Sequence, residues 1–478
     1  MVGSKWVFKV KKDAADQIER YCARLVAQGF TQVPGVDYFD MFTPIAKCTS
    51  IRTVLTTAAI NDWEIQQLNI KSTYLNGELD PAEIIFMRQP PGYAIPRQEQ
   101  CVLCLIKAIY GLKQSGRHWY EKLHDILTSQ GLTRCELDHT VFFHHEKNDI
   151  IIITVYVNDM LLALSSLKLL TKTKDKLRTF VEVSDLGNIH WLLGFEIKRD
   201  CEARLVSISQ KSYVESIIKH YRMEDAKPLS IPMDPNVSLS KSQSPMEPQK
   251  IAEMCEIPYH EIVGSLTYTA IGSHPDIAFT TSMLSHFNKN PGRVHWEAAK
   301  RVVHYLKGTP DWGITFGPGH EDDGMVGYTD TDGNSNEDRH AISGYVFMLN
   351  GGPISWSVKT QEIIALLTTE AEYVAMTHAA KEVLWLRSFV GEVFGPVVDA
   401  TTLFCDNQSA IVLAKDGKFY ARTKCIDIYY HFIHYIIEDG TINLIYCPTD
   451  EMVADTLTKA LPNAKAKHFA VAIGLRPA

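Results

Sequence analysis

The order of elements after Gly324 constrains the fold of this chain most. Hydrophobic periodicity predicts a strand, a hairpin, a long helix, a further strand and two more helices. The expected bounds are 325–329 for the first strand, 345–349 and 354–356 for the hairpin around a turn at 350–352, 368–390 for the long helix, 401–405 for the next strand, and helix starts near Asn407 and at Thr449 or Asp450. The Asn350-Gly351 pair is the kind of dipeptide that tight hairpin turns favour. This order predicts an α/β domain from about residue 323 onward.

The earlier part of the chain predicts a different architecture. Up to about residue 200, strand-like runs such as 151–157 (IIITVYV) alternate with helical runs such as 117–123 (RHWYEKL), which indicates a mixed α and β domain. Residues 229–253 are rich in Pro, Ser and Lys, a composition that cannot fill a core and indicates a tether. A mostly helical segment follows, from Tyr259 to about Lys307. The 478 residues suffice for about three domains of ~150 residues each.

Composition narrows the class of protein. No apolar run approaches the ~18 residues that a membrane span requires, so we expect no membrane partner and a location inside the cell. The 10 cysteines lack the dense spacing of a disulfide framework and are expected to be reduced thiols. Cys101 and Cys104 form the one close pair, and zinc would need two further ligands at suitable spacing. The net charge of -8 disfavours general nucleic-acid binding, although cations cluster locally between Lys107 and Lys122.

Four acidic residues of the α/β domain stand at element ends or on helix faces from which they could converge. Asp330 and Asp406 close predicted strands, Glu372 lies in the first turns of the long helix, and Asp455 opens the final helix. Any one of them alone is better explained as a helix cap or a surface acid. Together they meet the needs of two Mg²⁺ ions held about 3.5–4 Å apart, which require several carboxylate ligands.

The segments around these acids resemble ribonuclease H in the form found in copia-type retrotransposons. The matching segments are 327–332 (GYTDTD), 369–375 (TEAEYVA), 405–410 (CDNQSA) and 452–459 (MVADTLTK), in the order of that family. The resemblance implies that the metal-binding acids are Asp330, Glu372, Asp406 and Asp455, with Glu370 as the competing assignment on the helix. Gly333 and Cys425 depart from the family pattern, and neither change removes a metal ligand.

Several segments of the first 200 residues resemble copia-type reverse transcriptase. Residues 20–30 (RYCARLVAQGF) are similar to the fingers motif, where the resemblance implies that Arg24 meets the incoming triphosphate; Cys22 replaces a usual Lys. Residues 109–115 (IYGLKQS) match a segment whose glutamine, here Gln114, lines the nucleotide pocket. Residues 192–197 (LLGFEI) resemble the primer-gripping segment. The resemblance extends over nearly the whole chain.

Two segments that should carry the polymerase carboxylates have changed. Residues 67–77 (QLNIKSTYLNG) and 156–159 (YVND) resemble the family motifs, but Asn69 and Asn158 stand where the family has Asp. Asp159 alone survives. An amide carries no charge, and Mg²⁺ loses its water reluctantly without strong anionic ligands. We therefore expect a polymerase fold without useful polymerase activity, the alternative being that the two amides are tolerated in a working site.

The resemblance implies a fold that is α+β and α/β: a right-hand polymerase with fingers, palm and thumb, a connection region, and a C-terminal ribonuclease H-like domain. The predicted bounds are 1–200 for fingers and palm, 201–322 for thumb, tether and connection, and 323–478 for ribonuclease H. The implied cofactor is Mg²⁺, for which Mn²⁺ could substitute, and the implied partners are RNA–DNA hybrid, template RNA and primer, with deoxynucleotides if the polymerase is active. An alternative function is a non-catalytic nucleic-acid-binding or scaffold protein left by a transposon. Cytoplasm, virus-like particle and nucleus are the expected locations.

Overall fold

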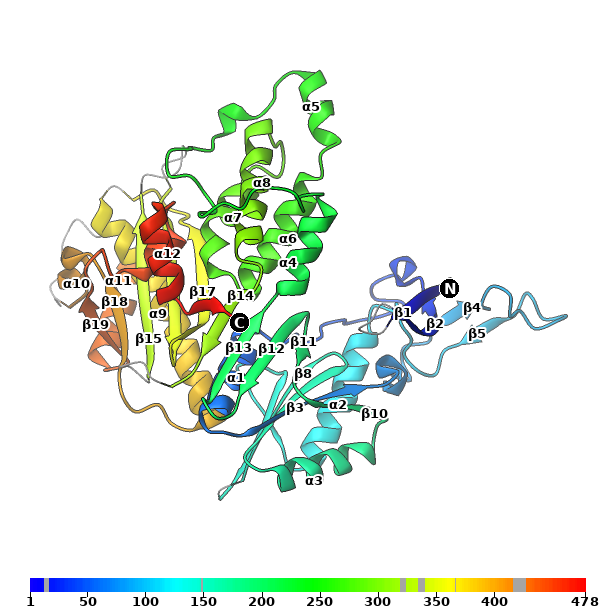
Figure 1. The fold of residues 1–478 in the computed structure, drawn as a ribbon. Helices are drawn as coiled ribbons and strands as arrows, with labels where there is room; N and C mark the ends of the chain where they lie inside the picture. The colour runs from blue at the N-terminus through cyan, green and yellow to red at the C-terminus, as the bar shows by residue number, and fades with distance from the viewer. Residues whose placement is uncertain (13–16, 148, 319–323, 334–339, 366, 416–426) are drawn as a thin grey trace. The chain divides into compact units, whose positions relative to one another are not determined.

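The computed structural model describes residues 1–12, 17–147, 149–318, 324–333, 340–365, 367–415 and 427–478 (Figure 1). Cys425 lies outside these residues. Two units divide the chain. The first unit comprises Met1–Lys47 and Glu64–Asn188, and the second comprises Cys48–Trp63 and Ile189–Ala478. The domain boundaries expected at residues 200 and 322 remain predictions.

A six-stranded antiparallel sheet is the centre of the first unit, with the strand order β10-β3-β9-β8-β7-β6. Its strands are β3 (Glu64–Ile70), β6 (Thr133–Arg134), β7 (Val141–Glu146), β8 (Asp149–Tyr156), β9 (Asp159–Leu164) and β10 (Val183–Asn188). The central strand β9 is apolar and is buried along nearly its whole length. The strand expected at 151–157 corresponds to β8.

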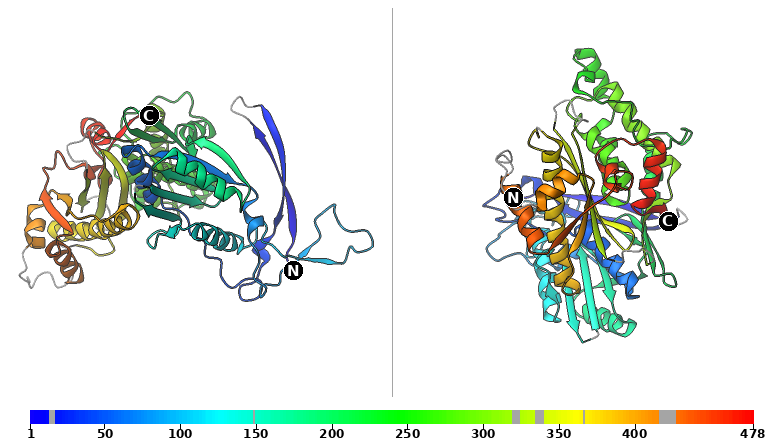
Figure 2. Two further views of the ribbon diagram at one scale, coloured as in Figure 1. Left: turned by 90° about the horizontal axis from the view of Figure 1, so that it is seen from below. Right: turned by 90° about the vertical axis from the view of Figure 1, so that its left-hand side faces the viewer.

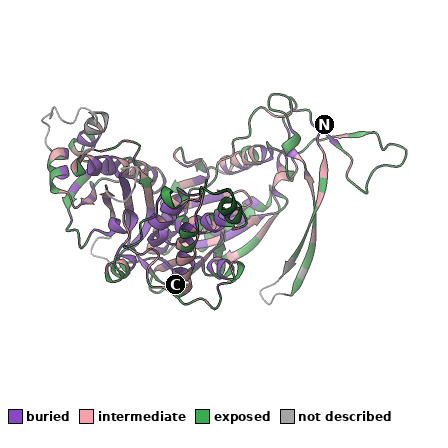
Figure 3. Cartoon of the chain, turned by 90° about the horizontal axis from the view of Figure 1, so that it is seen from above, coloured by how far each residue is buried: buried purple, intermediate pink, exposed green. Residues whose placement is uncertain are grey.

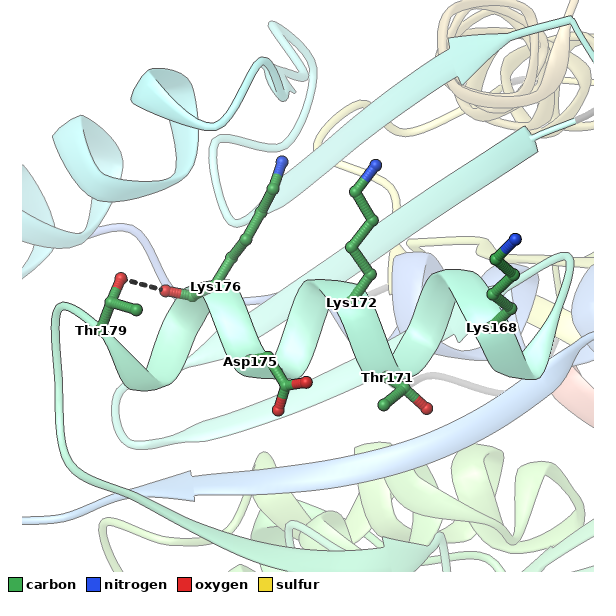
Figure 4. A pocket seen from close by; sticks show the side chains of 6 residues that line it. All are labelled: Lys168, Thr171, Lys172, Asp175, Lys176 and Thr179. Atoms are coloured by element: carbon green, nitrogen blue, oxygen red, sulfur yellow. Dashed lines mark hydrogen bonds between the residues drawn. The ribbon is translucent and has the colours of Figure 1, made fainter.

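Helices α2 (Ser115–Ser129) and α3 (Leu167–Arg178) pack on this sheet. Leu123 of α2 and Leu170 of α3 join one hydrophobic core with Leu162 of β9. The outer face of α3 carries Lys168, Lys172 and Lys176, one per helical turn, and Figure 4 shows these three side chains extending from the same side of the helix. All three are exposed, so this row is the solvated face of an amphipathic helix.

Two antiparallel pairs complete the first unit. β1 (Ser4–Lys12) and β2 (Ile18–Ala27) form a two-stranded ribbon, seen in dark blue in the left view of Figure 2. The pair β4 (Phe86–Arg88) and β5 (Val102–Cys104) contains one of the two neighbouring cysteines. Figure 3 shows the ribbon mainly exposed or half-buried, which fits two strands with no larger sheet beside them. The short 3-10 helices η1 (Gly29–Thr31) and η2 (Thr73–Asn76) lie in connections.

The second unit contains an antiparallel sheet that joins distant parts of the chain, in the order β11-β12-β13-β14-β20. Its strands are β11 (Trp191–Leu192), β12 (Phe195–Asp200), β13 (Leu205–Ser209), β14 (Trp312–Phe316) and the C-terminal β20 (Leu475–Pro477). The turn between β11 and β12 places Leu193 and Gly194 at φ values of 54° and 81°, so the segment expected to grip a primer forms a tight hairpin.

A helical group follows β13, in agreement with the helical segment expected over 259–307. Its members are α4 (Lys211–His220), α5 (Pro248–Cys255), α6 (Tyr259–Gly272), α7 (Ala278–Ser285) and α8 (Arg293–Gly308), with the 3-10 helices η3 (Lys241–Gln243) and η4 (Pro275–Ile277) between them. Buried residues of α4, α6, α7 and α8 form one hydrophobic core.

The segment 229–253 differs from the tether expected from its composition. Leu239 is buried in the helical core, and the Ser240 carbonyl oxygen lies 3.1 Å from Nε2 of His295. The backbone N–H of Leu229 donates to the carbonyl of His304 at 3.1 Å. Backbone groups of a Pro- and Ser-rich segment can thus be satisfied by helices beside them, which composition alone does not reveal.

The C-terminal part of the second unit is a five-stranded sheet in the order β17-β16-β15-β18-β19. The strands are β15 (Met325–Asp332), β16 (Ile342–Leu349), β17 (Gly352–Thr360), β18 (Thr401–Cys405) and β19 (Ile442–Tyr446). β15, β16 and β17 are antiparallel neighbours, while β18 is parallel to β15 and β19 is parallel to β18. Counted along this part of the chain, the order 3-2-1-4-5 is that of a ribonuclease H-like domain, as expected.

Helices cover both faces of this sheet. Phe469 of α12 (Asn463–Ala472) packs with Val346 and Met348 of β16, whereas Ser355, paired with Phe347 on the opposite face, donates its hydroxyl to Glu382 of α9 (Thr368–Phe394) at 2.6 Å. The remaining helices are α10 (Gln408–Lys415), α11 (Asp427–Glu438) and the 3-10 helix η6 (Val453–Leu457).

Two details of this domain differ from the sequence-based expectation. The helix expected from Thr449 or Asp450 is absent at that position: the short η6 contains Asp455, and the final α-helix begins at Asn463. Strand β19 and helix α11 were not expected. The hairpin turn is confirmed, since Asn350 and Gly351 both have positive φ values, of 48° and 75°.

Helix α1 (Cys48–Ile60) belongs to the second unit although it precedes β3 in the sequence. Its buried Arg52 donates to the carbonyl oxygens of Ile354, Ile271 and Gly272 at 2.9, 3.0 and 3.1 Å. The same guanidinium lies 3.9 Å from the ring centroid of Trp356. Arg52 therefore links α1 to β17 and caps the C-terminal carbonyls of α6.

Helices of the described residues are too short or too polar to cross a membrane. The described cysteines are free thiols, Cys101 and Cys104 among them.

Candidate active sites

The sheet topology explains why acidic residues meet in the ribonuclease H-like domain. Asp330 lies near the carboxyl end of β15, and Asp406 directly follows β18. Because these strands are parallel neighbours, and Val326 pairs with Thr402, continuing the register brings Asp330 level with Asp406. Carboxyl ends of parallel strands share one edge of a sheet, where open α/β sheets bind their ligands.

The other two acids reach the same edge from helices. Carboxylate oxygens of Asp330, Asp406 and Asp455 lie within 4.8 Å of one another, and so do ligand atoms of Glu372, Cys405 and Asp406. Glu372 comes from the second turn of α9, and Asp455 comes from η6. The structure thus brings the four predicted acids together through the shared Asp406. Glu370, the competing residue, belongs to neither group among the described residues.

Burial and mutual repulsion make this cluster expensive to ionise. Asp330 is 1% exposed, and burial raises its pKa to about 7, an effect that nearby Lys459 opposes and Asp455 reinforces. Glu372 is 6% exposed, and burial followed by the charges of Asp330 and Asp406 raises its pKa well above the ordinary range. Carboxyl groups that share one site with too little positive charge favour the protonated form.

Two lysines supply positive charge to the cluster. Nζ of Lys459 lies 2.7 Å from Oδ1 of Asp455 and 3.5 Å from Oδ2 of Asp330, and Nζ of Lys465 lies 2.9 Å from Oδ2 of Asp455. Burial alone would lower the pKa of Lys459. The carboxylates of Asp330 and Asp455 outweigh burial and raise the pKa above its ordinary value, so this ammonium stays charged. Thr458 donates its hydroxyl to Oδ2 of Asp330.

The donor set fits a divalent cation. Oε2 of Glu372 is buried and has no hydrogen-bond partner among the residues that the structure describes, which is costly unless a cation satisfies it. Four carboxylates offer the hard oxygen ligands that Mg²⁺ and Mn²⁺ prefer. Cys405 does not fit such an ion as a ligand, because burial and the charge of Glu372 raise the pKa of its thiol.

The first unit brings the polymerase-motif residues together at the end of the β8–β9 hairpin. Asn69 of β3 pairs in register with Asp159 of β9, and its Nδ2 donates to Oδ1 of Asp159 at 2.7 Å. The carbonyl of Asn158 accepts a hydrogen bond from the N–H of Ile70 at 2.8 Å. Val157, in the turn, has a φ of 57°, a strained conformation for a β-branched residue.

A pocket of about 750 Å³ adjoins this hairpin within the first unit. Asn69 and Asn158 line it, and so does Arg24 from β2, as the predicted contact of Arg24 with a triphosphate requires. Tyr74 and Tyr110 also line it, with ring centroids 4.9 Å apart in a T-shaped arrangement. Burial raises the pKa of Tyr74, which keeps this phenol neutral.

Gln114 directly precedes α2. Its side chain is 0% exposed; Oε1 accepts from Gln32 at 3.1 Å, while Nε2 donates to the Asp37 carbonyl at 2.9 Å and to Glu83 at 3.2 Å. It does not line the pocket next to Asn69. These hydrogen bonds hold a loop against the start of α2, and the expectation that Gln114 lines a nucleotide pocket stays a prediction.

Three residues of these sites were not predicted. Lys459 stands four residues after Asp455, a spacing that could have suggested a contact on a helix, and Lys465 lies beyond a proline. Tyr74 follows Asn69 by five residues and had no signal of its own.

Fold and site together define a class of protein, a reverse transcriptase with a ribonuclease H-like domain. The family profile described as "Reverse transcriptase (RNA-dependent DNA polymerase)" matches residues 1–235. Among curated relatives, the retrovirus-related Pol polyprotein from transposon TNT 1-94 of Nicotiana tabacum is 39% identical over 473 residues, covering 98% of this chain and 35% of that protein. A transposon Ty5-1 protein of Saccharomyces cerevisiae is 30% identical over 319 residues, covering 66% of this chain and all of that protein. The chain belongs to the Pol polyprotein family of copia-type retrotransposons.

Further comparisons give the extent of the likeness. The Pol polyprotein from transposon RE1 of Arabidopsis thaliana is 35% identical over 476 residues, covering 99% of this chain and 32% of that protein. The chain thus spans about a third of the length of such polyproteins. A foamy viral protease-reverse transcriptase in complex with RNA/DNA hybrid has a TM-score of 0.46 at 11% identity, covering 93% of this chain and 51% of that chain. The LC11-RNase H1 structure has a TM-score of 0.24 at 17% identity, covering 29% of this chain and 94% of that chain.

Proposed function

We propose that this chain hydrolyses the RNA strand of RNA–DNA hybrids at the cluster of four acids in its ribonuclease H-like domain. The observation that carries the proposal is the meeting of Asp330, Glu372, Asp406 and Asp455 at one sheet edge from four separate elements. Structural acids on a surface rarely combine such burial with mutual distances below 5 Å, because the charges repel one another.

The side chains of the cluster divide the work between them. Asp330, Asp455 and Glu372, all buried, would hold divalent cations together with Asp406, which belongs to both groups of ligand atoms. Bound Mg²⁺, or Mn²⁺ in its place, would activate a water molecule and stabilise the leaving oxygen. Glu372 would take up its metal-binding form by losing the proton that burial favours.

The lysines have a separate part in the proposal. Lys459 and Lys465 neutralise Asp455, and both ammonium groups would give up some of this pairing to a bound cation. Each is then available to a phosphate of the hybrid backbone. A ribonuclease of this kind recognises backbone shape and the 2′-hydroxyl rather than base identity.

The second half of the proposal is that the polymerase site of the palm is impaired. Asn69 and Asn158 lower the anionic charge of the polymerase site, and Asn69 also donates to the remaining carboxylate of Asp159. Asp159 is thus already hydrogen-bonded to a neutral group where an intact site would present free carboxylates to Mg²⁺. If each amide costs about 10²–10³-fold, as one missing electrostatic stabiliser does, primer extension falls to background.

A paired assay of the purified chain tests both halves. Labelled RNA–DNA hybrid and a primed RNA template would be followed side by side in Mg²⁺ and in Mn²⁺, with Asp330→Asn as the nuclease-site variant and exposed Asp311→Asn as its matched control. We expect hybrid cleavage that Asp330→Asn lowers at least ~10²-fold and Asp311→Asn leaves unchanged, and extension near background. A folded chain that cuts no hybrid in either metal would refute the nuclease, and robust extension would refute the impaired palm.

The alternative of a non-catalytic scaffold predicts a different pattern. A scaffold would bind hybrid equally well whether the four carboxyl groups are ionised or protonated, and it would not cleave the RNA strand. The retained cluster argues against it, since buried carboxylates without a metal destabilise a fold that only has to bind.

A further inference from the structure

The pocket beside Asn69 and Asn158 is lined by cationic side chains and by these two neutral amides. We propose that this palm pocket binds the polyphosphate of a nucleoside triphosphate directly, without a divalent cation. The proposal rests on the impaired polymerase proposed above and is independent of the nuclease.

The charged side chains that line the pocket are all positive among the described residues. Its cationic lining residues are Arg20, Arg24 and Lys71, and no acidic side chain is among the described residues that line it. The positive charge of Lys71 is partly neutralised, because its Nζ lies 2.5 Å from Oε1 of Glu182. Arg20 and Arg24 are both exposed on β2, where their guanidinium groups can reach an anion in the pocket.

The remaining carboxylate, that of Asp159, is hydrogen-bonded to Asn69. Oδ1 of Asp159 lies 2.7 Å from the side-chain nitrogen of Asn69, and only the NH₂ end of an amide can donate to a carboxylate. Asp159 does not line the pocket. Its charge is therefore turned toward Asn69 and is partly satisfied by that hydrogen bond, which weakens its repulsion of an incoming phosphate.

A comparison with the family motif shows why the metal requirement changes. Three carboxylates and a triphosphate repel one another, so an intact site needs cations between them before a nucleotide can bind. Two of those carboxylates are neutral amides here, at Asn69 and Asn158. The polyphosphate then meets two arginines with little opposing charge, and charge-assisted hydrogen bonds to guanidinium replace the ions.

The rest of the pocket indicates a nucleotide rather than a bare anion. Tyr74 and Tyr110 present aromatic surface on the pocket wall, and Cζ of Arg24 lies 5.1 Å from the ring centroid of Tyr110. A ring of this kind can stack with a sugar or base while the guanidinium beside it bonds phosphate. The volume of about 750 Å³ lies within the range of nucleotide-sized ligand sites.

Calorimetric titration of the full-length chain with a deoxynucleoside triphosphate, in EDTA and in Mg²⁺, tests the proposal. We expect the Kd in EDTA to equal that in Mg²⁺ within about threefold, or to be lower. In the variant Asn69→Asp with Asn158→Asp, binding in EDTA should become at least ~10-fold weaker than in Mg²⁺, because the restored charges repel the phosphates. Inorganic triphosphate should bind more weakly than the nucleotide, and the deoxynucleoside should not bind.

Matched variants separate the pocket from general electrostatics. Arg20→Gln with Arg24→Gln removes two positive charges from the pocket, and Lys168→Gln with Lys172→Gln removes two from the exposed face of α3. Only the first pair should weaken nucleotide binding in EDTA, by at least ~10-fold. Binding that requires Mg²⁺ in the unmodified chain, or that both pairs weaken equally, would overturn the proposal. Hybrid cleavage by all these variants reports separately on the nuclease.

Discussion

Replacing Asp330 by asparagine should stabilise the second unit while it abolishes cleavage. Burial raises the pKa of Asp330 from an ordinary 3.8 to about 7, so the folded protein disfavours the ionised carboxylate that the unfolded chain carries. At ~1.4 kcal/mol per pKa unit, ionising this group in the fold costs about 4 kcal/mol. Lys459 loses a partner in the variant, which offsets part of the gain. We expect a rise of about 2–4 kcal/mol in the free energy of unfolding at pH 8.

The sign of the pH dependence follows from the raised pKa. Below about pH 4 the carboxyl is protonated in both states, and Asp330→Asn should change stability little. Between pH 4 and 7 the unfolded chain ionises first, so the unmodified protein loses stability as the pH rises. The advantage of Asp330→Asn therefore grows over this interval and becomes constant above pH 7.

Hydrogen exchange of the β15 and β16 amides across a urea series, in EDTA at pH 8 and at pH 5, measures this effect in the domain concerned. EDTA excludes stabilisation of the unmodified protein by bound cations. Asp311→Asn, an exposed acid of the same unit, is the matched control and should have no effect. A variant that is destabilised at pH 8, or stabilised equally at both pH values, would refute the reasoning.

Three further predictions concern other parts of the chain. Arg52→Met should lower the free energy of unfolding of the second unit by about 2–4 kcal/mol in urea titrations, because three carbonyls, two of them in buried contacts, lose their donor. A change below ~0.5 kcal/mol would contradict this. Asn69→Asp together with Asn158→Asp should give weak but measurable primer extension, either reversion alone should do little, and Cys22→Lys should lower the nucleotide concentration required; an inert, folded double variant would show further damage. Glu372→Gln should lower hybrid cleavage at least ~10²-fold in Mg²⁺ with its melting temperature retained or raised, and cleavage within threefold of the unmodified rate would remove Glu372 from the site.

Features with a local cause could be predicted from the sequence. The hairpin at Asn350-Gly351 follows from the two positive φ values that this dipeptide tolerates, and β18 was bounded correctly because its apolar run ends at a charged residue. The convergence of Asp330 and Asp406 was predictable in the same way, since Asp330 lies near the end of one strand and Asp406 directly follows another. Their roles as metal ligands stay predictions.

Features that depend on distant partners could not be predicted. Gln114 hydrogen-bonds to Asp37 and Glu83, residues far from it in sequence. Leu239 lies in a Pro- and Ser-rich segment whose composition says nothing of the helices that bury it. Asp455 sits in a 3-10 turn because a short apolar run fits either helix type until packing selects one.

The place of α1 in the second unit has a consequence for how the chain can be cut. The polypeptide passes between the two units at residues 47/48, 63/64 and 188/189, so one cleavage near residue 189 leaves α1 on the N-terminal fragment. That fragment would keep hold of the other through Arg52 and its carbonyl partners. A fragment that begins at residue 189 and is made without α1 would have three carbonyls that lack their Arg52 donor. Cleavage at this point would therefore yield two fragments held together by α1 rather than two separate ones.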